Sequence, residues 1–232
     1  MAKPIKKTDQ KRPWNRANKR HTPNRRPERF YFLLVSEGNT ESLYFRAFAS
    51  TLPQDLIHVT AFGTGFNTLS IVNEVAAIKR KKETELGFKF DHVWVIFDKD
   101  SFLGDHFDNA IYSCAGRKKL YGVAWSNECF ELWYLLHFKD QRTGLGRQTI
   151  YRALEKGLGI GGYEKLKGEA GRTVHERMAT HASQATAIAR AKKLYTEWND
   201  PKAQRTPPSQ QNPCTTVYQL VEKLLACRQP EK

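Results

Sequence analysis

Residues 30–41 have the sequence Phe-Tyr-Phe-Leu-Leu-Val-Ser-Glu-Gly-Asn-Thr-Glu, in which a continuous apolar run is followed directly by polar residues. A run of this length, bounded by polar residues, is typical of a strand that is buried on both faces of a sheet. Residues 93–97, Val-Trp-Val-Ile-Phe, form a second run of this kind and lead into Asp98-Lys99-Asp100. Both stretches therefore predict buried strands that end in acidic residues.

Strand and helix patterns alternate four times between residues 30 and 138. Apolar runs cover residues 30–35, 56–62, 93–97 and 121–125, and helical patterns follow them near residues 40–48, 68–82, 107–115 and 128–138. Such alternation is the signature of βαβ units, in which helices pack on the faces of a parallel sheet. We therefore expect an α/β fold with a mostly parallel sheet flanked by helices.

After residue 139 the pattern changes to helices and loops. The Ala-rich stretch 172–198 predicts one long helix, and the polar residues 212–216 are expected to cap a last helix. We therefore expect residues 30–140 to form the α/β core and residues 141–232 to form a helical extension packed on it. A chain of 232 residues is long enough to bury such a core without disulfide bonds.

The positive charge of the chain is concentrated at its N-terminus. Residues 1–29 contain eleven Lys or Arg and two acidic residues, which is a net charge of +9 out of +14 for the whole chain. This segment also holds four prolines and almost no large apolar side chain, so it cannot bury enough surface to offset its chain entropy. We expect a disordered basic arm, which either binds nucleic acid or only raises solubility.

Composition also narrows the class of protein. No apolar run approaches the roughly 20 residues of a membrane span, and no apolar stretch follows the basic N-terminus as in a secretory signal. The chain has four cysteines, Cys114, Cys129, Cys214 and Cys227. They form no CxxC pair, and their spacing matches no zinc ribbon or zinc finger. We therefore expect a cytoplasmic protein without membrane contact, in which these thiols are reduced and mostly buried.

Acidic residues follow two of the predicted strands. Glu37 comes after the first strand, with Glu41 one helical turn later, and Asp98 and Asp100 come after the third. In an open parallel sheet, ligands bind at the carboxyl ends of the strands. Carboxylates gathered there repel one another unless a cation bridges them, and Mg²⁺ or Mn²⁺ prefers such oxygen ligands. The alternative is structural, because aspartates at strand ends also form turns and cap helices.

A third acidic segment, Ser-Asn-Glu-Cys-Phe-Glu, follows the fourth strand. Its Asn127 and Glu128 come directly after that strand, and Glu128 and Glu131 are expected to share one face of the helix over 128–138. Glu131 has apolar neighbours in the sequence and therefore needs a partner when it is buried. Two roles for Glu131 stay open: it either supports a metal site or pairs with a buried Lys or Arg. His137 is expected to be a hydrogen-bonded core residue, and the Gly63-Thr64-Gly65 turn is expected to be structural.

Taken in order, these motifs resemble the RloB-like family. The resemblance rests on residues 35–41 with Tyr44-Phe45, residues 93–100, Ser126-Asn127 with residues 129–133 and 137–138, and Asn212-Pro213 before a terminal helix. It implies a Toprim-like fold, a small parallel α/β domain also found in topoisomerases, primases and OLD-type nucleases. It further implies a metal site built from Glu37, Asp98 and Asp100. Glu128 departs from the family pattern, in which a proline is expected at this position.

The resemblance also implies a function and partners. Family members are commonly encoded beside an ABC/OLD-type ATPase in prokaryotic anti-phage or restriction-associated loci. The leading hypothesis is therefore a Mg²⁺- or Mn²⁺-dependent nuclease that acts on RNA or DNA as a defence effector. Whether the chain forms a homo-oligomer stays open. In this hypothesis Glu131 is a catalytic residue together with the three metal ligands. The residues that would support the site are Glu41, Lys99, Asn127 and Glu128.

Two alternatives belong to other classes of protein. The strand that ends in Asp98 also resembles the DxD strand of haloacid-dehalogenase-type phosphatases, in which the first Asp is a nucleophile. That strand usually opens the fold, whereas two βα units precede it here. The second alternative is a non-catalytic subunit that binds nucleic acid or regulates an ATPase, and in which the acidic cluster is structural.

Overall fold

The structure is a computed structural model that describes residues 29–65, 67–100, 103–116, 121–166, 174, 177–178 and 183–228. The expected basic arm therefore lies outside the described residues, apart from Arg29. Much of the first part of the expected helix over 172–198 also lies outside them.

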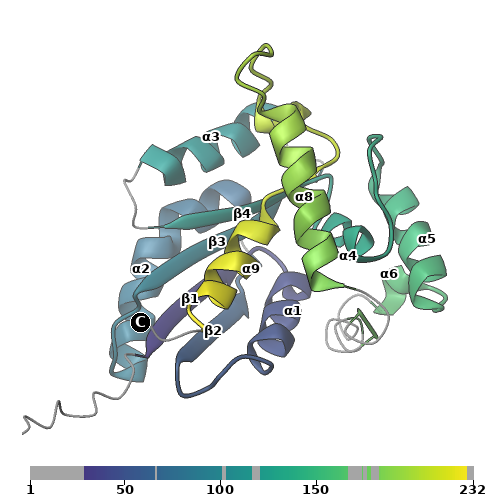
Figure 1. The fold of residues 1–232 in the computed structure, drawn as a ribbon. Helices are drawn as coiled ribbons and strands as arrows, with labels where there is room; N and C mark the ends of the chain where they lie inside the picture. The colour runs from purple at the N-terminus through teal and green to yellow at the C-terminus, as the bar shows by residue number, and fades with distance from the viewer. Residues whose placement is uncertain are drawn as a thin grey trace, which may run out of the picture.

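Within these described ranges, five strands form one sheet, in the order β2-β1-β3-β4-β5 (Figure 1). The first four are parallel, and β5 is antiparallel to β4. Their bounds are Phe30–Ser36 for β1, Ile57–Gly63 for β2, His92–Asp98 for β3, Gly122–Asn127 for β4 and Cys214–Thr215 for β5. The mostly parallel α/β architecture is confirmed. The sequence did not predict β5, because a strand of two residues is too short to carry a pattern.

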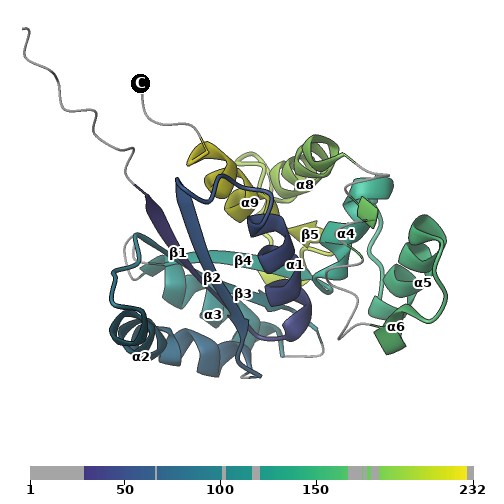
Figure 2. The same cartoon turned by 90° about the horizontal axis from the view of Figure 1, so that it is seen from below.

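Helices cover both faces of the sheet, so that the molecule has three layers. Figure 2 shows α2 (Thr68–Leu86) and α3 (Gly104–Gly116) on one face, with α1 (Asn39–Ala49) and α9 (Val217–Ala226) on the other. Helix α8 (Gln184–Trp198) lies beside α9, and three further helices lie toward the end of the sheet to which the parallel strands point. These are α4 (Glu131–Phe138), α5 (Arg147–Leu158) and α6 (Tyr163–Leu166). A 3₁₀ turn, η3 (Pro208–Gln210), precedes β5.

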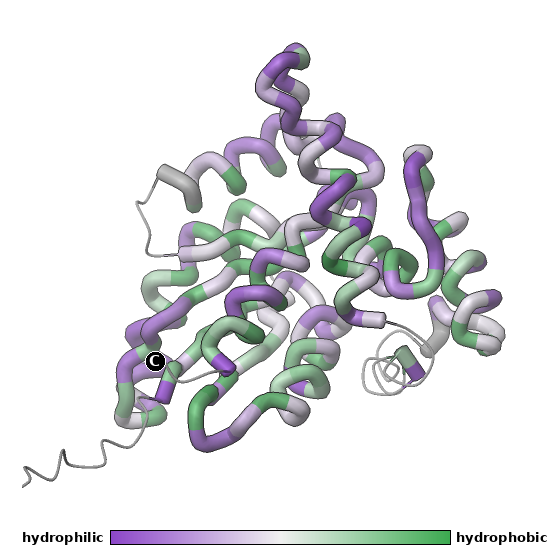
Figure 3. Tube along the Cα trace, in the orientation of Figure 1, coloured by the Kyte–Doolittle hydropathy of each residue, from purple (hydrophilic) through white to green (hydrophobic). Residues whose placement is uncertain are grey.

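The two faces of the sheet bury separate hydrophobic clusters. Along β1, Phe32 and Leu34 pack in the cluster with α1, α4 and α9, whereas Leu33 and Val35 pack in the cluster with α2 and α3. Successive side chains of a strand point to opposite faces, so a strand covered on both sides needs a continuous apolar run. In Figure 3 hydrophobic residues gather along the strands, and hydrophilic ones are common at the outer turns.

The structure corrects the beginnings of two of the expected helices. Helix α4 begins at Glu131 rather than at residue 128, because Glu128 lies in the turn after β4 and its carbonyl accepts a hydrogen bond from the Asp100 amide. Helix α8 begins at Gln184, because Ser183 is extended and its hydroxyl caps the helix. Helix α9 begins at Val217, directly after residues 212–216 as expected. Thr216 makes no side-chain hydrogen bond to the helix, but the Thr215 hydroxyl accepts one from the Val217 amide at 3.3 Å, so a polar residue of this segment does cap the helix.

The strand order creates a switch point between β1 and β3. From β1 the chain passes through α1 on one face to β2 at the sheet edge, and it then returns through α2 on the other face to β3. In open α/β sheets the crevice for a ligand lies at the carboxyl ends of the two strands where the direction of winding reverses. The residues that follow β1 and β3 therefore occupy the favoured position for a binding site.

Candidate acidic active site

Glu37 is held at the carboxyl end of β1 by its own backbone. Its amide donates to the Ile96 carbonyl of β3 at 3.0 Å, and its carbonyl accepts from the Gly65 amide at 2.9 Å. The Thr68 hydroxyl, from the first turn of α2, donates to Oε2 of Glu37 at 3.2 Å. Glu37 is thus fixed between β3 and the loop after β2, and its side chain is half-buried.

The environment of Glu37 disfavours its negative charge. Burial raises the pKa of its carboxyl group to about 7, and the nearby Asp100 carboxylate adds to the increase. The hydrogen bond from Thr68 and the positive charge of Arg147 act in the opposite direction but are weaker together. A pKa this far above the usual range of a glutamate means that the site lacks a full counter-charge near Glu37.

Asp98 ends β3, and Asp100 lies in the turn that follows. The Lys99 amide donates to the Ser126 carbonyl at 2.9 Å, and the Asp100 amide donates to the Glu128 carbonyl at 3.0 Å. Asp100 has a φ angle of 44°, in the left-handed region that non-glycine residues rarely adopt. The Lys99 ammonium donates to the Asp100 carbonyl at 3.2 Å. These hydrogen bonds therefore hold the turn after β3 against the end of β4, with Asp100 in a strained conformation.

Arg147, which no motif in the sequence marked, contacts this turn from α5. Its Nη2 lies 2.6 Å from Oδ1 of Asp100. Arg147 is the first residue of its helix, after the N-cap Gly146, and a cation at this end opposes the helix dipole. That local conflict is the signal in the sequence that could have marked Arg147 as a functional candidate.

Two further acidic side chains of the predicted site, Glu41 and Glu131, are buried. Glu131 is fully buried in the first turn of α4, and its Oε1 accepts a hydrogen bond from the Tyr163 hydroxyl at 3.4 Å. Burial raises the pKa of Tyr134, and the charges of Glu131, Glu41 and Asp98 raise it further. These three carboxylates therefore lie within electrostatic reach of one buried phenol. The Tyr163 hydroxyl is thus one hydrogen-bond partner of the buried Glu131 carboxylate.

Two predicted support residues have other contacts. Asn127 is buried, and its amide donates to the carbonyls of Pro208 and Ser209 at 3.1 and 2.8 Å, so its side chain holds η3 against β4. Glu128 does not share a helical face with Glu131, because α4 begins only at Glu131. That part of the prediction is wrong.

The carboxylates at the carboxyl ends of β1 and β3 are suitable ligands for a hard cation, but they do not surround a common metal position. Glu37, Asp98 and Asp100 offer carboxylate oxygens, which Mg²⁺ and Mn²⁺ prefer. Within the residues that the structure describes, no three His, Cys, Asp or Glu side chains are grouped closely enough to hold a metal ion. Asp100 is instead paired with Arg147. The metal site stays a prediction, and its donors fit by chemistry rather than by the spacing found here.

The other sequence motifs have structural roles. In the turn after β2 the Thr64 amide donates to the Ser36 carbonyl at 2.9 Å, which ties this turn to the end of β1. His137 is buried, with Nδ1 2.9 Å from the Trp133 carbonyl, which confirms the prediction of a hydrogen-bonded core histidine. All four cysteines are free and buried, as expected.

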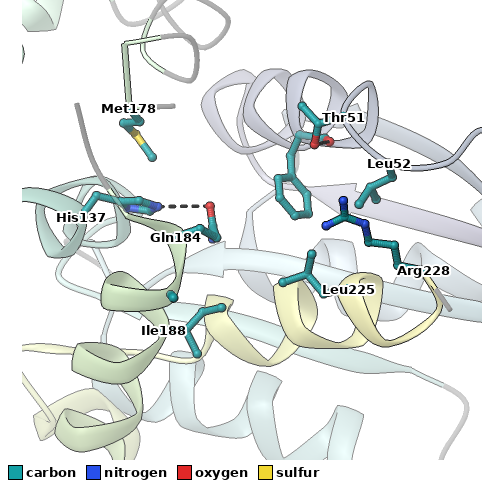
Figure 4. Close-up of a pocket in the computed structure, with 10 residues that line it drawn as sticks. Thr51, Leu52, His137, Met178, Gln184, Ile188, Leu225 and Arg228 are labelled. Carbon is teal, nitrogen blue, oxygen red and sulfur yellow. Dashed lines mark hydrogen bonds between the residues drawn. The ribbon is translucent and has the colours of Figure 1, made fainter. Parts of the chain in front are cut away.

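A separate hollow of about 430 Å³ opens between α1, α8 and α9 (Figure 4). Its lining is largely apolar and includes none of the acidic residues described above; its polar members are Thr51, His137, Gln184 and Arg228. In Figure 4 a hydrogen bond joins His137 to Gln184 across this lining, at 3.3 Å. The hollow is therefore distinct from the acidic edge of the sheet.

A comparison with known protein families agrees with the resemblance found in the sequence. The model of the RloB-like protein family matches residues 32–224, which is most of the chain. This chain belongs to the RloB-like family. No curated protein matches it significantly. Among the described residues of this RloB-like chain, no helix is both long and apolar enough to cross a membrane.

Proposed function

We propose that this RloB-like chain is a Mg²⁺- or Mn²⁺-dependent nuclease with a Toprim-like core, and that it acts on RNA or DNA. One observation carries the proposal: Glu37 and the Asp98–Asp100 turn follow neighbouring parallel strands at the switch point of the sheet. Carboxylates gathered at such an edge are the donors that a catalytic divalent cation needs.

Glu37, Asp98 and Asp100 would hold the cation, which would polarise a phosphoryl oxygen and ready a water molecule for attack. Lys99 and Arg147 bring positive charge to the same turn, where a phosphodiester would approach. Glu131 and Glu41 are buried within electrostatic reach of Tyr134, as Asp98 is, and would support the site from inside the fold. The basic arm would raise affinity for nucleic acid without reading its sequence.

Cleavage by the purified chain tests the metal-dependent activity. We expect RNA or DNA to be cut with Mg²⁺ or Mn²⁺ and to survive in EDTA. Asp98→Asn, Asp100→Asn and Glu37→Gln should each lower the rate by about a hundredfold or more, since bound metal supplies several kcal/mol of charge stabilisation. Asp105→Asn, at an exposed position of α3, is the matched control and should cut normally. Full activity in the Asp98 and Asp100 variants would contradict the assignment.

We further propose that the chain is the effector of a prokaryotic anti-phage system that works with an ABC/OLD-type ATPase. The support is membership of the RloB-like family, together with the risk that an uncontrolled nuclease poses to its own cell. We expect the chain to be weakly active alone and to gain activity and toxicity when it is expressed with an ATPase encoded beside it. Equal activity with and without that ATPase would contradict this control.

A second candidate function is a non-catalytic subunit that binds nucleic acid or regulates the ATPase. The ion pair between Arg147 and Asp100 favours it, because the pair neutralises one of the proposed metal ligands within the chain. Binding of nucleic acid without cleavage, unchanged by Asp98→Asn, would support this candidate. Turnover of a phosphate monoester that requires Asp98 and leaves oligonucleotides intact would favour the phosphatase alternative instead.

A further inference from the structure

The contact between Arg147 and Asp100 joins two residues that are each placed unfavourably on their own. Asp100 has a positive φ angle, and Arg147 puts a positive charge at the N-terminal end of α5. The side chains are 30% and 32% exposed, and ion pairs this open to water stabilise a fold by only about 0–1 kcal/mol. Stability of the fold therefore does not explain why these residues meet. Local conflicts of this kind are concentrated at functional sites.

The guanidinium of Arg147 has unused hydrogen-bonding capacity. Among the described residues, its Nε is buried and has no hydrogen-bond acceptor. A guanidinium carries five N–H donors in a planar fork, which matches two oxygens of a phosphate group. Asp100 satisfies only part of that fork through its Oδ1. The guanidinium can therefore donate more hydrogen bonds to a phosphate group than it donates to Asp100, provided that another cation neutralises Asp100.

Charge balance decides which partner Arg147 takes. Without a metal ion, Arg147 is the counter-charge that pairs with Asp100. A divalent cation at these carboxylates would repel the guanidinium, whereas the phosphodiester that arrives with it brings a negative charge that attracts it.

Resting on the proposed function, we propose that Arg147 exchanges its ion pair with Asp100 for a phosphate oxygen of the nucleic acid when a divalent cation binds. Arg147 is then both the internal counter-ion of the empty site and a substrate-binding residue of the loaded one. The proposal predicts opposite effects of one substitution on two ligands, which a purely structural ion pair would not produce.

The test compares Arg147→Gln and Arg147→Lys with Arg152→Gln, which removes a charge from an exposed position of the same helix. Binding of Mn²⁺ alone is measured by calorimetry, and binding of a labelled oligonucleotide by anisotropy, in Ca²⁺ to suppress cleavage. Arg147→Gln should bind Mn²⁺ roughly tenfold more tightly, because a repelling charge is removed. It should bind the oligonucleotide roughly tenfold more weakly, because a charge-assisted hydrogen bond to phosphate is lost.

Arg147→Lys keeps the charge but loses the fork, so its Mn²⁺ affinity should stay near that of the unchanged chain while its oligonucleotide affinity falls part of the way. Arg152→Gln should leave both affinities nearly unchanged. Circular dichroism and the melting temperature verify that each variant folds.

The inference is overturned if Arg147→Gln changes only one of the two affinities, or changes neither. Cleavage of nucleic acid with unchanged affinities in this variant would remove the inference and leave the nuclease function in place. The two expected changes without cleavage in any cation would keep the inference and remove the nuclease function. Absence of Mn²⁺ binding by all four proteins would overturn the inference together with the metal site.

Discussion

Glu37 is a residue whose charge the folded chain disfavours, and this has a consequence that can be measured without any substrate. Its folded pKa of about 7 lies above the ordinary value of 4.5, mainly because of burial. A raised pKa of this kind contributes stability below about pH 4.5, and this contribution is lost as the pH rises through about 7. The metal-free protein should therefore lose stability relative to a variant that carries no charge at this position.

We expect Glu37→Gln to gain stability over the unchanged chain as the pH rises from about 5 to about 8 in EDTA, as measured by urea unfolding. Glu74→Gln, at an exposed position of α2, is the control and should show no such trend. A difference between Glu37→Gln and the unchanged chain that stays constant over this range would show that burial does not perturb Glu37.

At the scale of elements, the end of β2 supports the turn that carries Glu37. A Cβ atom at Gly63 would lie 2.5 Å from the Gly38 carbonyl oxygen and 2.9 Å from its carbonyl carbon. These are backbone atoms of the β1–α1 turn and cannot rotate away as a side chain does. The absence of a side chain at Gly63 thus allows β2 to approach the turn at the acidic edge.

Gly63→Ala should therefore destabilise the fold by about 1–3 kcal/mol, because the turn must move to make room for the methyl group. Urea unfolding measures the loss. Gly161→Ala is the matched control, since a Cβ there would meet nothing within 4 Å and the residue does not have a positive φ angle. Equal stability of the two variants would mean that the Gly63 contact is easily relieved.

At the scale of the whole molecule, the charge is divided between the N-terminal segment and the folded core. Residues 1–29 hold +9 of the net +14, while the acidic edge of the sheet lies in the core. The basic residues of this segment would contact phosphates irrespective of base sequence, and each contact should add about −0.9 to the slope of log K against log salt on duplex DNA.

Deletion of residues 2–28 should weaken nucleic-acid binding at low salt and flatten that slope by several units, with little change in melting temperature. Anisotropy over a range of salt concentrations measures the slope, and replacement of the segment by an uncharged linker of equal length controls for chain length. An unchanged slope with poorer solubility would identify the segment as a solubilising tail.

Much of the sheet could be predicted from local pattern. Strands β1 and β3 are covered on both faces, so nearly every side chain in them must be apolar, and their runs stand out in the sequence. The acidic residues that follow these strands could also be placed at one edge of the sheet, because parallel strands all end on the same side. The helix over 172–198 was predicted too long, because Ala-rich composition does not reveal that Ser183 caps α8.

The sequence alone was sufficient for the α/β class and for placing Glu37, Asp98 and Asp100 at the same edge of the sheet, because parallel strands all end on the same side. Strand β5 and the contact of Arg147 with Asp100 required the folded chain. Thr215 pairs with Ser126, and Arg147 contacts Asp100. The residues of each pair are far apart in the sequence, and no local pattern indicates that they meet. Periodicity reports which face of an element is buried, whereas the partner that covers it depends on how distant elements pack.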